Sequence, residues 1–184
     1  MQIFFNDDST NLVKFAFKGD SDNPFFEGAK GAIFPKLEED TILLGLGDKD
    51  KFSKETFKEA IYKLGKYIQA KDITGLSFKK SDLDLDDKDF VLGLIEALKV
   101  SSYKFDYYKS EKTENKLENI NLEASLSSYE DNINELIDVL DGQFFARNLI
   151  NLRSNDLYPE TLANYAKDEL ENLGVKESIY EEGE

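Results

Sequence analysis

The chain has few of the side chains that most enzymes use for catalysis. Its 184 residues include no histidine and no cysteine. These absences exclude histidine general bases, Ser-His-Asp triads, disulfide frameworks and zinc sites built on thiolates. Catalysis would then require carboxylates, lysine or tyrosine, and no spacing in the sequence singles out such a set. We therefore predict no catalytic residue in this chain.

A pair of glycines marks one candidate ligand site. Gly45-Leu46-Gly47-Asp48 lies between an apolar run and a predicted helix, where a phosphate often binds at the helix N-terminus. The dinucleotide fingerprint needs a third glycine where Asp50 lies, and the next predicted strand ends in Ser77-Phe78-Lys79 without an acidic ribose partner. Asp48 and Asp50 would also repel an anion. We interpret the segment as a tight strand-to-helix turn and predict no cofactor-binding residue.

A cluster of aspartates has a spacing that invites comparison with a calcium loop: Asp82, Asp84, Asp86, Asp87 and Asp89. An EF-hand loop starting at Asp82 needs glycine where Asp87 lies and glutamate where Gly93 lies. Both positions are wrong for that motif. We expect Asp86 to cap a helix, with Asp89 complementing its dipole, and we predict no metal-binding residue.

Aromatic side chains alternate along Tyr103, Phe105 and Tyr107, with Tyr108 beside them. Such a set could stack on a base or a sugar. Aromatics at alternating strand positions more often form one face of a core. We predict a strand over residues 103–107 with its aromatic residues in the core.

Composition and charge limit the kinds of molecule that this chain can be expected to bind. Hydrophobic residues make up 40% of the chain, which favours a folded domain over a disordered one. The formal net charge of -15 argues against a nucleic-acid partner, because the phosphate backbone would be repelled. No signal-peptide pattern and no apolar run of membrane-spanning length is present. We expect a soluble, cytoplasmic protein without a membrane partner.

Alternating strand and helix patterns predict an α/β fold. The apolar run Thr41–Leu46 predicts a central strand buried on both faces, and a helix over residues 53–70 and a strand over 73–78 complete a βαβ unit. The other expected elements are strands over residues 2–5, 12–17, 31–34 and 120–124 and a helix over residues 87–100.

The last part of the chain predicts two helices with a break between them. Ser127-Ser128-Tyr129-Glu130 matches a capping box and predicts the start of the first helix. Ser154-Asn155-Asp156 interrupts the helical pattern, and Pro159 suits the first position of a second helix that Gly174 ends. A strand is expected over residues 175–180. A long helix, a short break and another helix are typical of a connector between domains.

Two segments resemble the leucyl (cytosol) aminopeptidases, two-metal exopeptidases that remove N-terminal amino acids. Ala146–Asn151, with the break and helix that follow it to Leu173-Gly174-Val175, is similar to the family's interdomain segment. Leu43–Gly47 and the helix after it are similar to the strand–turn–helix of the family's N-terminal domain. Two positions depart from the family: Arg153 replaces a proline, and Tyr158 replaces a serine or threonine.

This resemblance implies a macro-domain-like α/β domain over residues 1–142, with a mixed sheet flanked by helices. Residues 143–184 would then form the helical interdomain linker and the start of a catalytic domain. The family's metal ligands, catalytic lysine and Asn-Thr-Asp-Ala-Glu-Gly-Arg signature belong to that catalytic domain, and the signature is absent here. No catalytic, cofactor-binding or metal residue carries over.

The resemblance also implies partners and cofactors for a parent enzyme. The parent would bind two divalent metals, zinc or manganese, and assemble as a hexamer, with this domain serving assembly or access to the active site. Its partners would be its own C-terminal catalytic domain and other subunits. Residues 147–156 should become more ordered when that domain is present. The alternative is a macro-like module that binds ADP-ribose or a nucleotide near Gly45 to Asp50.

Overall fold

The computed structural model describes residues 1–7, 10–21, 23–71, 73–80, 83–112 and 114–180. Their chain forms two compact units, Met1–Leu140 and Asp141–Glu184. The long helix α3 (Glu130–Asn151) belongs to both. We call these units the first unit and the second unit.

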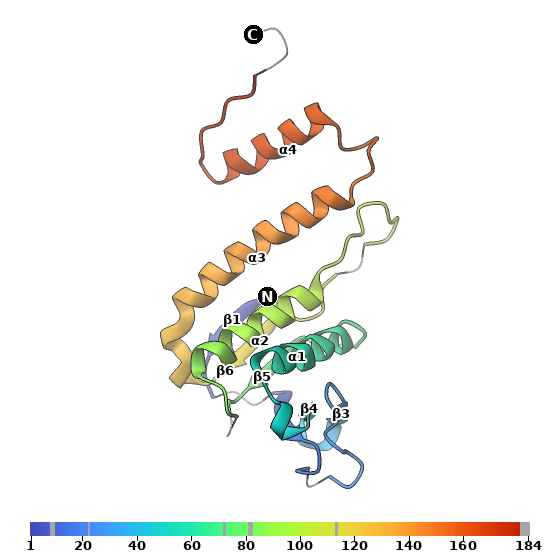
Figure 1. Cartoon of the computed structure of the whole chain (residues 1–184), viewed down its shortest axis with the longest axis vertical. Coiled ribbons are helices and arrows are strands. Elements are labelled where there is room, and N and C mark those ends of the chain that lie inside the picture. Colours follow the sequence, from blue (N-terminus) through green and yellow to red (C-terminus); the bar gives the residue numbers. More distant parts are fainter. Residues whose placement is uncertain (8–9, 22, 72, 81–82, 113, 181–184) are drawn as a thin grey trace. The chain divides into compact units, whose positions relative to one another are not determined.

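A six-stranded sheet forms the centre of the first unit (Figure 1). The strands lie in the order β1-β6-β5-β2-β4-β3, and every pair is parallel except β3 with β4. Their bounds are β1 Gln2–Phe5, β2 Leu12–Phe17, β3 Ile33–Lys36, β4 Thr41–Gly47, β5 Gly75–Phe78 and β6 Asn119–Leu122. Pro35 fits the antiparallel strand β3 because an edge strand tolerates a missing N–H. The predicted mixed sheet is confirmed.

Strand β4 is the most deeply buried strand, because all seven of its residues are buried. It pairs with β2 on one side and β3 on the other, so its backbone groups are satisfied within the sheet. Strands β4 and β5 both run parallel to β2, which lies between them. The predicted βαβ unit is therefore present, and its helix carries the chain over one intervening strand.

Helix α1 (Lys54–Gln69) connects these two strands. Ser53 and Thr56 form a capping box: the Thr56 N–H donates to Ser53 Oγ (3.3 Å), and the Ser53 N–H donates to Thr56 Oγ1 (2.8 Å). The buried side of α1 follows its 3.6-residue period, and its members are Phe57, Ala60, Ile61, Leu64, Gly65 and Ile68. This side is what the apolar spacing of the sequence predicts.

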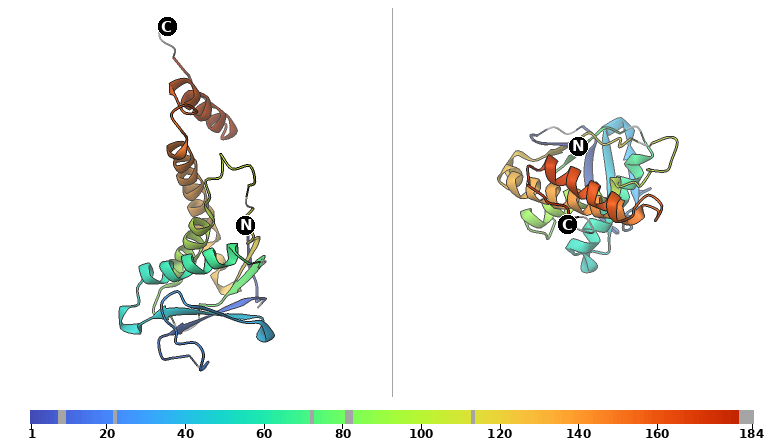
Figure 2. Two further views of the ribbon diagram at one scale, coloured as in Figure 1. Left: turned by 90° about the vertical axis from the view of Figure 1, so that its right-hand side faces the viewer. Right: turned by 90° about the horizontal axis from the view of Figure 1, so that it is seen from above.

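Helix α2 (Asp87–Ser102) lies beside α1 on the sheet (Figure 2). Aromatic rings join the two helices to β2: the Phe57 and Phe90 centroids are 5.5 Å apart, and Phe15 lies 5.7 Å from Phe57 and 6.1 Å from Phe90. These distances fall in the favourable range for aromatic pairs. The core of the first unit is therefore a layer of helices packed on one sheet.

The start of α3 differs from its prediction. Residues Ala124–Tyr129 form a 3-10 helix, so Ser127 has helical backbone geometry and lies inside an element where a cap would need to lie outside it. The predicted capping box is therefore wrong. Leu126, which is buried, holds this turn against the core, and α3 follows directly, with Ile133 and Leu140 buried.

The second unit contains the end of α3 and helix α4 (Pro159–Asn172). A turn at Ser154–Asp156 separates the helices, and Pro159 is the first helical residue, as predicted. Gly174 has a φ of +69°, and the Val175 N–H donates to the Leu170 carbonyl (2.9 Å), which makes a Schellman end. The strand predicted over residues 175–180 does not form, because the described part of this unit offers no strand to pair with.

Candidate functional site

A cavity of about 370 Å³ lies at the carboxyl end of β4, where the sequence places the Gly45 to Asp50 turn. Three lysines line it, namely Lys18 after β2, Lys30 and Lys51. The carboxylates of Glu27 and Asp48 lie in the same wall. The sequence did not reveal this group because Lys18 and Lys30 lie in the connection from β2 to β3 and Lys51 in the connection after β4, and only the folded sheet brings these connections together. The sequence offered one signal for this group: Lys18 follows a predicted strand directly, and Lys30 lies beside a glycine.

The lysines of this cavity are already paired with carboxylates. Asp48 lies 3.2 Å from the Lys51 Nζ and 3.9 Å from the Lys18 Nζ. Lys30 pairs with Glu59 on α1, and this hydrogen bond lowers the pKa of the Glu59 carboxyl. A phosphate entering the cavity would have to compete with these internal anions.

The backbone of the turn is held by the neighbouring loop. The Gly47 N–H donates to the Gly28 carbonyl (2.9 Å), and Gly47 accepts from the Lys18 N–H (2.9 Å). A Cβ added at Gly45 would lie 2.1 Å from the carbonyl oxygen of Ala29, so only glycine permits this approach. These contacts fit the predicted tight strand-to-helix turn. The prediction that it contains no cofactor-binding residue stays a prediction.

Three aspartates of the acidic cluster, Asp86, Asp87 and Asp89, lie at the start of α2. Asp86 is the N-cap of α2, and its carboxylate accepts from the Asp89 N–H at 2.7 Å. Asp89 also pairs with Lys54, and this hydrogen bond raises the pKa of the Lys54 amine. Asp87 pairs with Lys80. Asp82 lies outside the described residues.

In the parts of the chain that the structure describes, no three His, Cys, Asp or Glu side chains come together as a metal site. No described helix is long and apolar enough to cross a membrane.

The predicted aromatic strand is wrong. Residues 103–106 leave α2 as an irregular segment, and a turn follows at Tyr107 and Tyr108. The rings pack on one another outside the core, with centroids 5.0 Å apart for Tyr107 and Tyr108 and 5.8 Å for Phe105 and Tyr108. Both tyrosines are exposed. The alternating aromatic residues form a cluster within a loop, because aromatic rings can pack on one another without a β-sheet.

The connector and α4 are the other feature that the sequence singled out. Tyr158 supplies no side-chain cap to α4, but its N–H donates to the Thr161 Oγ1 (2.9 Å), and the Thr161 hydroxyl donates back to the Asp156 carbonyl (3.1 Å). Thr161 therefore secures the turn in place of the missing cap. No described residue from 141 to 180 is buried. The sequence predicted the apolar stripe of α4, but not that it would be exposed.

Comparisons with known proteins identify relatives over most of the chain. Residues 32–112 match the model of the cytosol aminopeptidase family, N-terminal domain. A probable cytosol aminopeptidase of Clostridium tetani is 31% identical over 163 residues, which is 84% of this chain and 34% of that protein. One of Aquifex aeolicus is 28% identical over 165 residues, which is 85% of this chain and 33% of that protein. The chain thus spans about a third of the length of these relatives.

Solved structures show the same fold. The bottromycin maturation enzyme BotP superposes with a TM-score of 0.77 at 16% identity, covering 96% of this chain and 40% of that one. A mutant of tomato leucine aminopeptidase superposes with a TM-score of 0.72 at 16% identity, covering 95% of this chain and 43% of that one. The sheet and helices described above are thus also the fold of the matching part of these two enzymes. The chain belongs to the cytosol aminopeptidase family and corresponds to its N-terminal domain.

Proposed function

We propose that this chain is the non-catalytic N-terminal domain of a metal-dependent leucyl aminopeptidase. The parent enzyme hydrolyses peptides by removing their N-terminal amino acids. The observation that carries the proposal is the match of residues 32–112 to the family's N-terminal domain, in a chain that spans about a third of its relatives' length. In keeping with it, the chain contains no histidine or cysteine, and Asp86, Asp87 and Asp89 serve as a helix cap and ion-pair partners.

The chemistry belongs to the part of the parent that follows this domain. Two divalent ions, zinc or manganese, would activate the attacking water there. One structural neighbour, BotP, has been solved in complex with Mn. The proposal assigns no metal ligand to the present chain. Residues 1–142 would form the α/β domain, and residues 143–184 the helical interdomain linker and the start of the catalytic domain.

The domain serves assembly or access to the active site of a cytoplasmic hexamer. Two features support a role outside the chemistry. The first unit has a complete core of its own and can hold a fixed shape at the periphery of an assembly. The connector after it joins two helices through a turn that Thr161 holds, which suits the attachment of a second domain.

An activity assay tests this proposal. The purified chain and the full-length protein are assayed on leucine-p-nitroanilide with manganese or zinc, each with a chelator control. We expect metal-dependent turnover from the full-length protein and none from residues 1–184. Turnover by residues 1–184 that the chelator abolishes would contradict the proposal, and so would a full-length protein without any aminopeptidase activity.

A second candidate function is a macro-like module that binds ADP-ribose or a nucleotide. The cavity beside Gly47, with Lys18, Lys30 and Lys51 in its wall, is the observation that favours it. Calorimetry with ADP-ribose checks this candidate, with Lys51→Ala as the variant and Lys71→Ala, away from the cavity, as the control. Binding heat that is lost in Lys51→Ala but kept in Lys71→Ala would support this second function. The absence of binding heat at millimolar ADP-ribose would exclude it.

A further inference from the structure

We infer that the cavity at the carboxyl end of β4 binds a small zwitterion, namely an amino acid or dipeptide with a free ammonium group and a free carboxylate. We call it the β4 cavity, and the wall residues that matter here are Lys18, Glu27, Ala29, Leu46, Asp48 and Lys51. The inference goes beyond the proposed function, because a role in assembly or access needs no ligand in this domain.

The β4 cavity lies where open α/β sheets commonly bind ligands, outside the carboxyl ends of parallel strands. Strands β2 and β4 are parallel neighbours, so both end at the cavity. Lys18 follows β2 directly, and Asp48 follows β4 directly. The volume of about 370 Å³ is at the lower end of the range of about 300–1,000 Å³ for small-molecule sites. It suits a ligand of the size of an amino acid or dipeptide.

Backbone hydrogen bonds join the segments that form the wall of the cavity. The Lys18 N–H donates to the Gly47 carbonyl (2.9 Å), and the Gly47 N–H donates to the Gly28 carbonyl (2.9 Å). The Gly19 N–H donates to the Glu27 carbonyl (3.2 Å). The end of β2, the loop before β3 and the end of β4 are therefore tied together before any ligand enters. Such preorganisation lowers the entropy that binding costs.

The ends of β2 and β4 have a surplus of positive charge. The Lys51 Nζ lies 3.2 Å and the Lys18 Nζ 3.9 Å from the carboxylate of Asp48, so two ammonium groups share one carboxylate. Both lysine side chains are largely exposed, and exposed ion pairs rearrange at little cost. The carboxylate of a ligand can therefore join the two lysines and balance the surplus.

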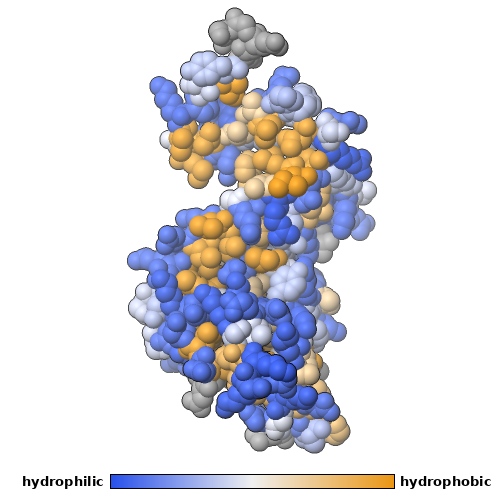
Figure 3. All heavy atoms as spheres, in the orientation of Figure 1, coloured by the Kyte–Doolittle hydropathy of each residue, from blue (hydrophilic) through white to orange (hydrophobic). Residues whose placement is uncertain are grey.

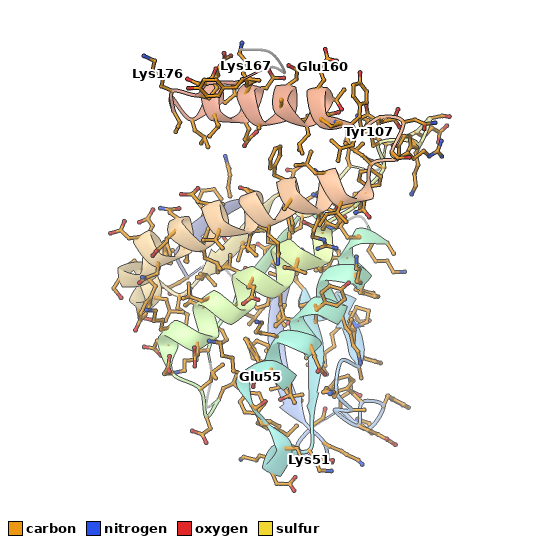
Figure 4. The ribbon with its side chains drawn as sticks, turned by 45° about the horizontal axis from the view of Figure 1, so that its top comes forward. Lys51, Glu55, Tyr107, Glu160, Lys167 and Lys176 are labelled. Atoms are coloured by element: carbon orange, nitrogen blue, oxygen red, sulfur yellow. The ribbon has the colours of Figure 1, made fainter. Side chains whose placement is uncertain are left out.

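The figures show this region of the first unit. Figure 4 shows Lys51 in the turn that leads from β4 into α1. Figure 3, drawn in the orientation of Figure 1, shows hydrophilic residues gathered at the same turn. The charged groups of the turn are thus accessible to a ligand from solvent.

A negative charge without a partner lies in the same wall. Glu27 is exposed, and within the described parts of the chain its carboxylate has no ion-pair or hydrogen-bond partner. Lys30, the third lysine of the wall, pairs instead with Glu59 on α1. The Glu27 carboxylate can therefore accept hydrogen bonds from the ammonium group of a ligand.

These two charges of opposite sign determine the class of ligand. A phosphate would satisfy the lysines but would bring like charge to Glu27 and Asp48, and a simple amine would meet the lysines with like charge. A zwitterion matches both signs without a net charge. Leu46, which is buried, and Ala29 give the wall an apolar part that an aliphatic side chain can contact. Leucine and its derivatives are therefore suitable probes.

Calorimetry on residues 1–184 tests the inference with a series of related ligands. L-leucine and leucyl-leucine have both charges at different separations, leucinamide lacks the carboxylate, and N-acetyl-leucine lacks the ammonium group. We expect leucine or leucyl-leucine to bind at millimolar concentration, and the tighter of the two identifies a free amino acid or a dipeptide as the ligand. Leucinamide and N-acetyl-leucine should bind at least about 10-fold more weakly, because each leaves one charge of the wall without a partner.

Two variants assign the charges to their residues. Glu27→Gln removes the carboxylate that is expected to hold the ammonium group, so it should weaken leucine about 10-fold and leave N-acetyl-leucine unchanged. Lys51→Met should weaken leucine and N-acetyl-leucine and leave leucinamide unchanged. This crossed pattern links each protein charge to one ligand charge, which a general loss of structure would not do.

Matched control variants remove the same charges elsewhere. Glu38 follows β3 beside the start of β4, at the opposite end of that strand from the cavity, and Lys71 follows the C-terminal end of α1. Glu38→Gln and Lys71→Met should keep the original affinity for leucine. All four side chains are exposed, so all four variants should keep the unfolding midpoint of the original chain.

Four results would overturn the inference. One is the absence of binding by leucine and leucyl-leucine at about 10 mM, a concentration at which even a weak specific site is filled. A second is equal binding of leucine, leucinamide and N-acetyl-leucine, which would show that the cavity does not recognise the charges. A third is binding that neither Glu27→Gln nor Lys51→Met weakens. The fourth is ADP-ribose that binds more tightly than leucine and depends on Lys51, which would assign the cavity to a nucleotide.

Discussion

Strand β4 and helix α1 in the first unit bury continuous sets of apolar side chains, whereas helix α4 in the second unit buries none. The two helices have similar lengths, and both have an apolar stripe and an ordered N-terminus. The two helices differ in how deeply the apolar stripe is buried. Helix α1 faces a sheet, and its Phe57, Ile61 and Leu64 are fully buried. The same sequence pattern therefore lies in a core in one unit and on a surface without buried residues in the other.

This difference decides where the stability of the chain resides. Burial of apolar area is the main favourable contribution to folding, so the first unit should unfold as a cooperative whole. In the second unit no described residue is buried, so this contribution is smaller there. We expect substitutions of equal size to have unequal effects in the two units.

The largest contrast should come from removing a large apolar side chain in each unit. Phe57→Ala empties a site that is 0% exposed and contacts Phe15, Phe52 and Phe90, so we expect a loss of about 3–5 kcal/mol in unfolding free energy. Ile150→Ala changes a side chain that is 82% exposed and should cost less than about 0.5 kcal/mol. Urea denaturation measures both. A large loss from Ile150→Ala would break the contrast.

Two glycine-to-alanine substitutions should act in opposite directions. Gly45→Ala places a methyl group 2.1 Å from the Ala29 carbonyl oxygen, so we expect the first unit to lose about 1–3 kcal/mol. Gly142 lies within α3 with nothing near its added Cβ, so Gly142→Ala should favour the helix by about 0.5–1 kcal/mol. Denaturation reports the first effect and far-ultraviolet circular dichroism the second. Destabilisation by Gly142→Ala would reveal packing around it.

A smaller effect concerns the ion pair between α1 and α2. Asp89 raises the pKa of Lys54, so the pair contributes fully below the ordinary lysine pKa of 10.5. The contribution is lost as the pH rises through the higher folded-state pKa. Both side chains are about one-third exposed, so we expect Lys54→Met to cost about 0.5 kcal/mol at neutral pH. A difference between the two proteins that persisted at strongly alkaline pH would contradict this origin.

Much of the fold was predictable because local patterns and tertiary packing agree. The helix predicted over residues 53–70 forms as Lys54–Gln69, since Ser53 caps it and its apolar period meets a sheet. The prediction over residues 103–107 failed because alternating aromatics are equally compatible with a loop in which rings cover one another. Ser127 failed as a cap because the buried Leu126 favours a 3-10 turn around it. The spacing of apolar residues in a sequence shows neither whether rings pack in a loop nor which turn a buried residue favours.

The candidate sites were less predictable than the fold. The Gly45 to Asp50 turn was visible as a motif, but the lysines of its cavity lie at sequence positions 18, 30 and 51. Only the strand order, which places β2 beside β4, brings them together. The exposure of Leu162 and Leu173 on α4 could not be predicted either, because apolar spacing in a sequence does not show how deeply the side chains are buried.

The division between a first unit with its own core and a second unit without buried residues is tested most directly by removing α4. Denaturant unfolding is compared for residues 1–184 and for a chain that ends at Asn151, the last residue of α3. Because α4 buries no side chain, we predict the same unfolding free energy within about 0.5 kcal/mol and the same m-value, which follows the area exposed on unfolding. A loss of stability above about 1 kcal/mol, or a smaller m-value, would show that α4 already belongs to the core and would contradict this account.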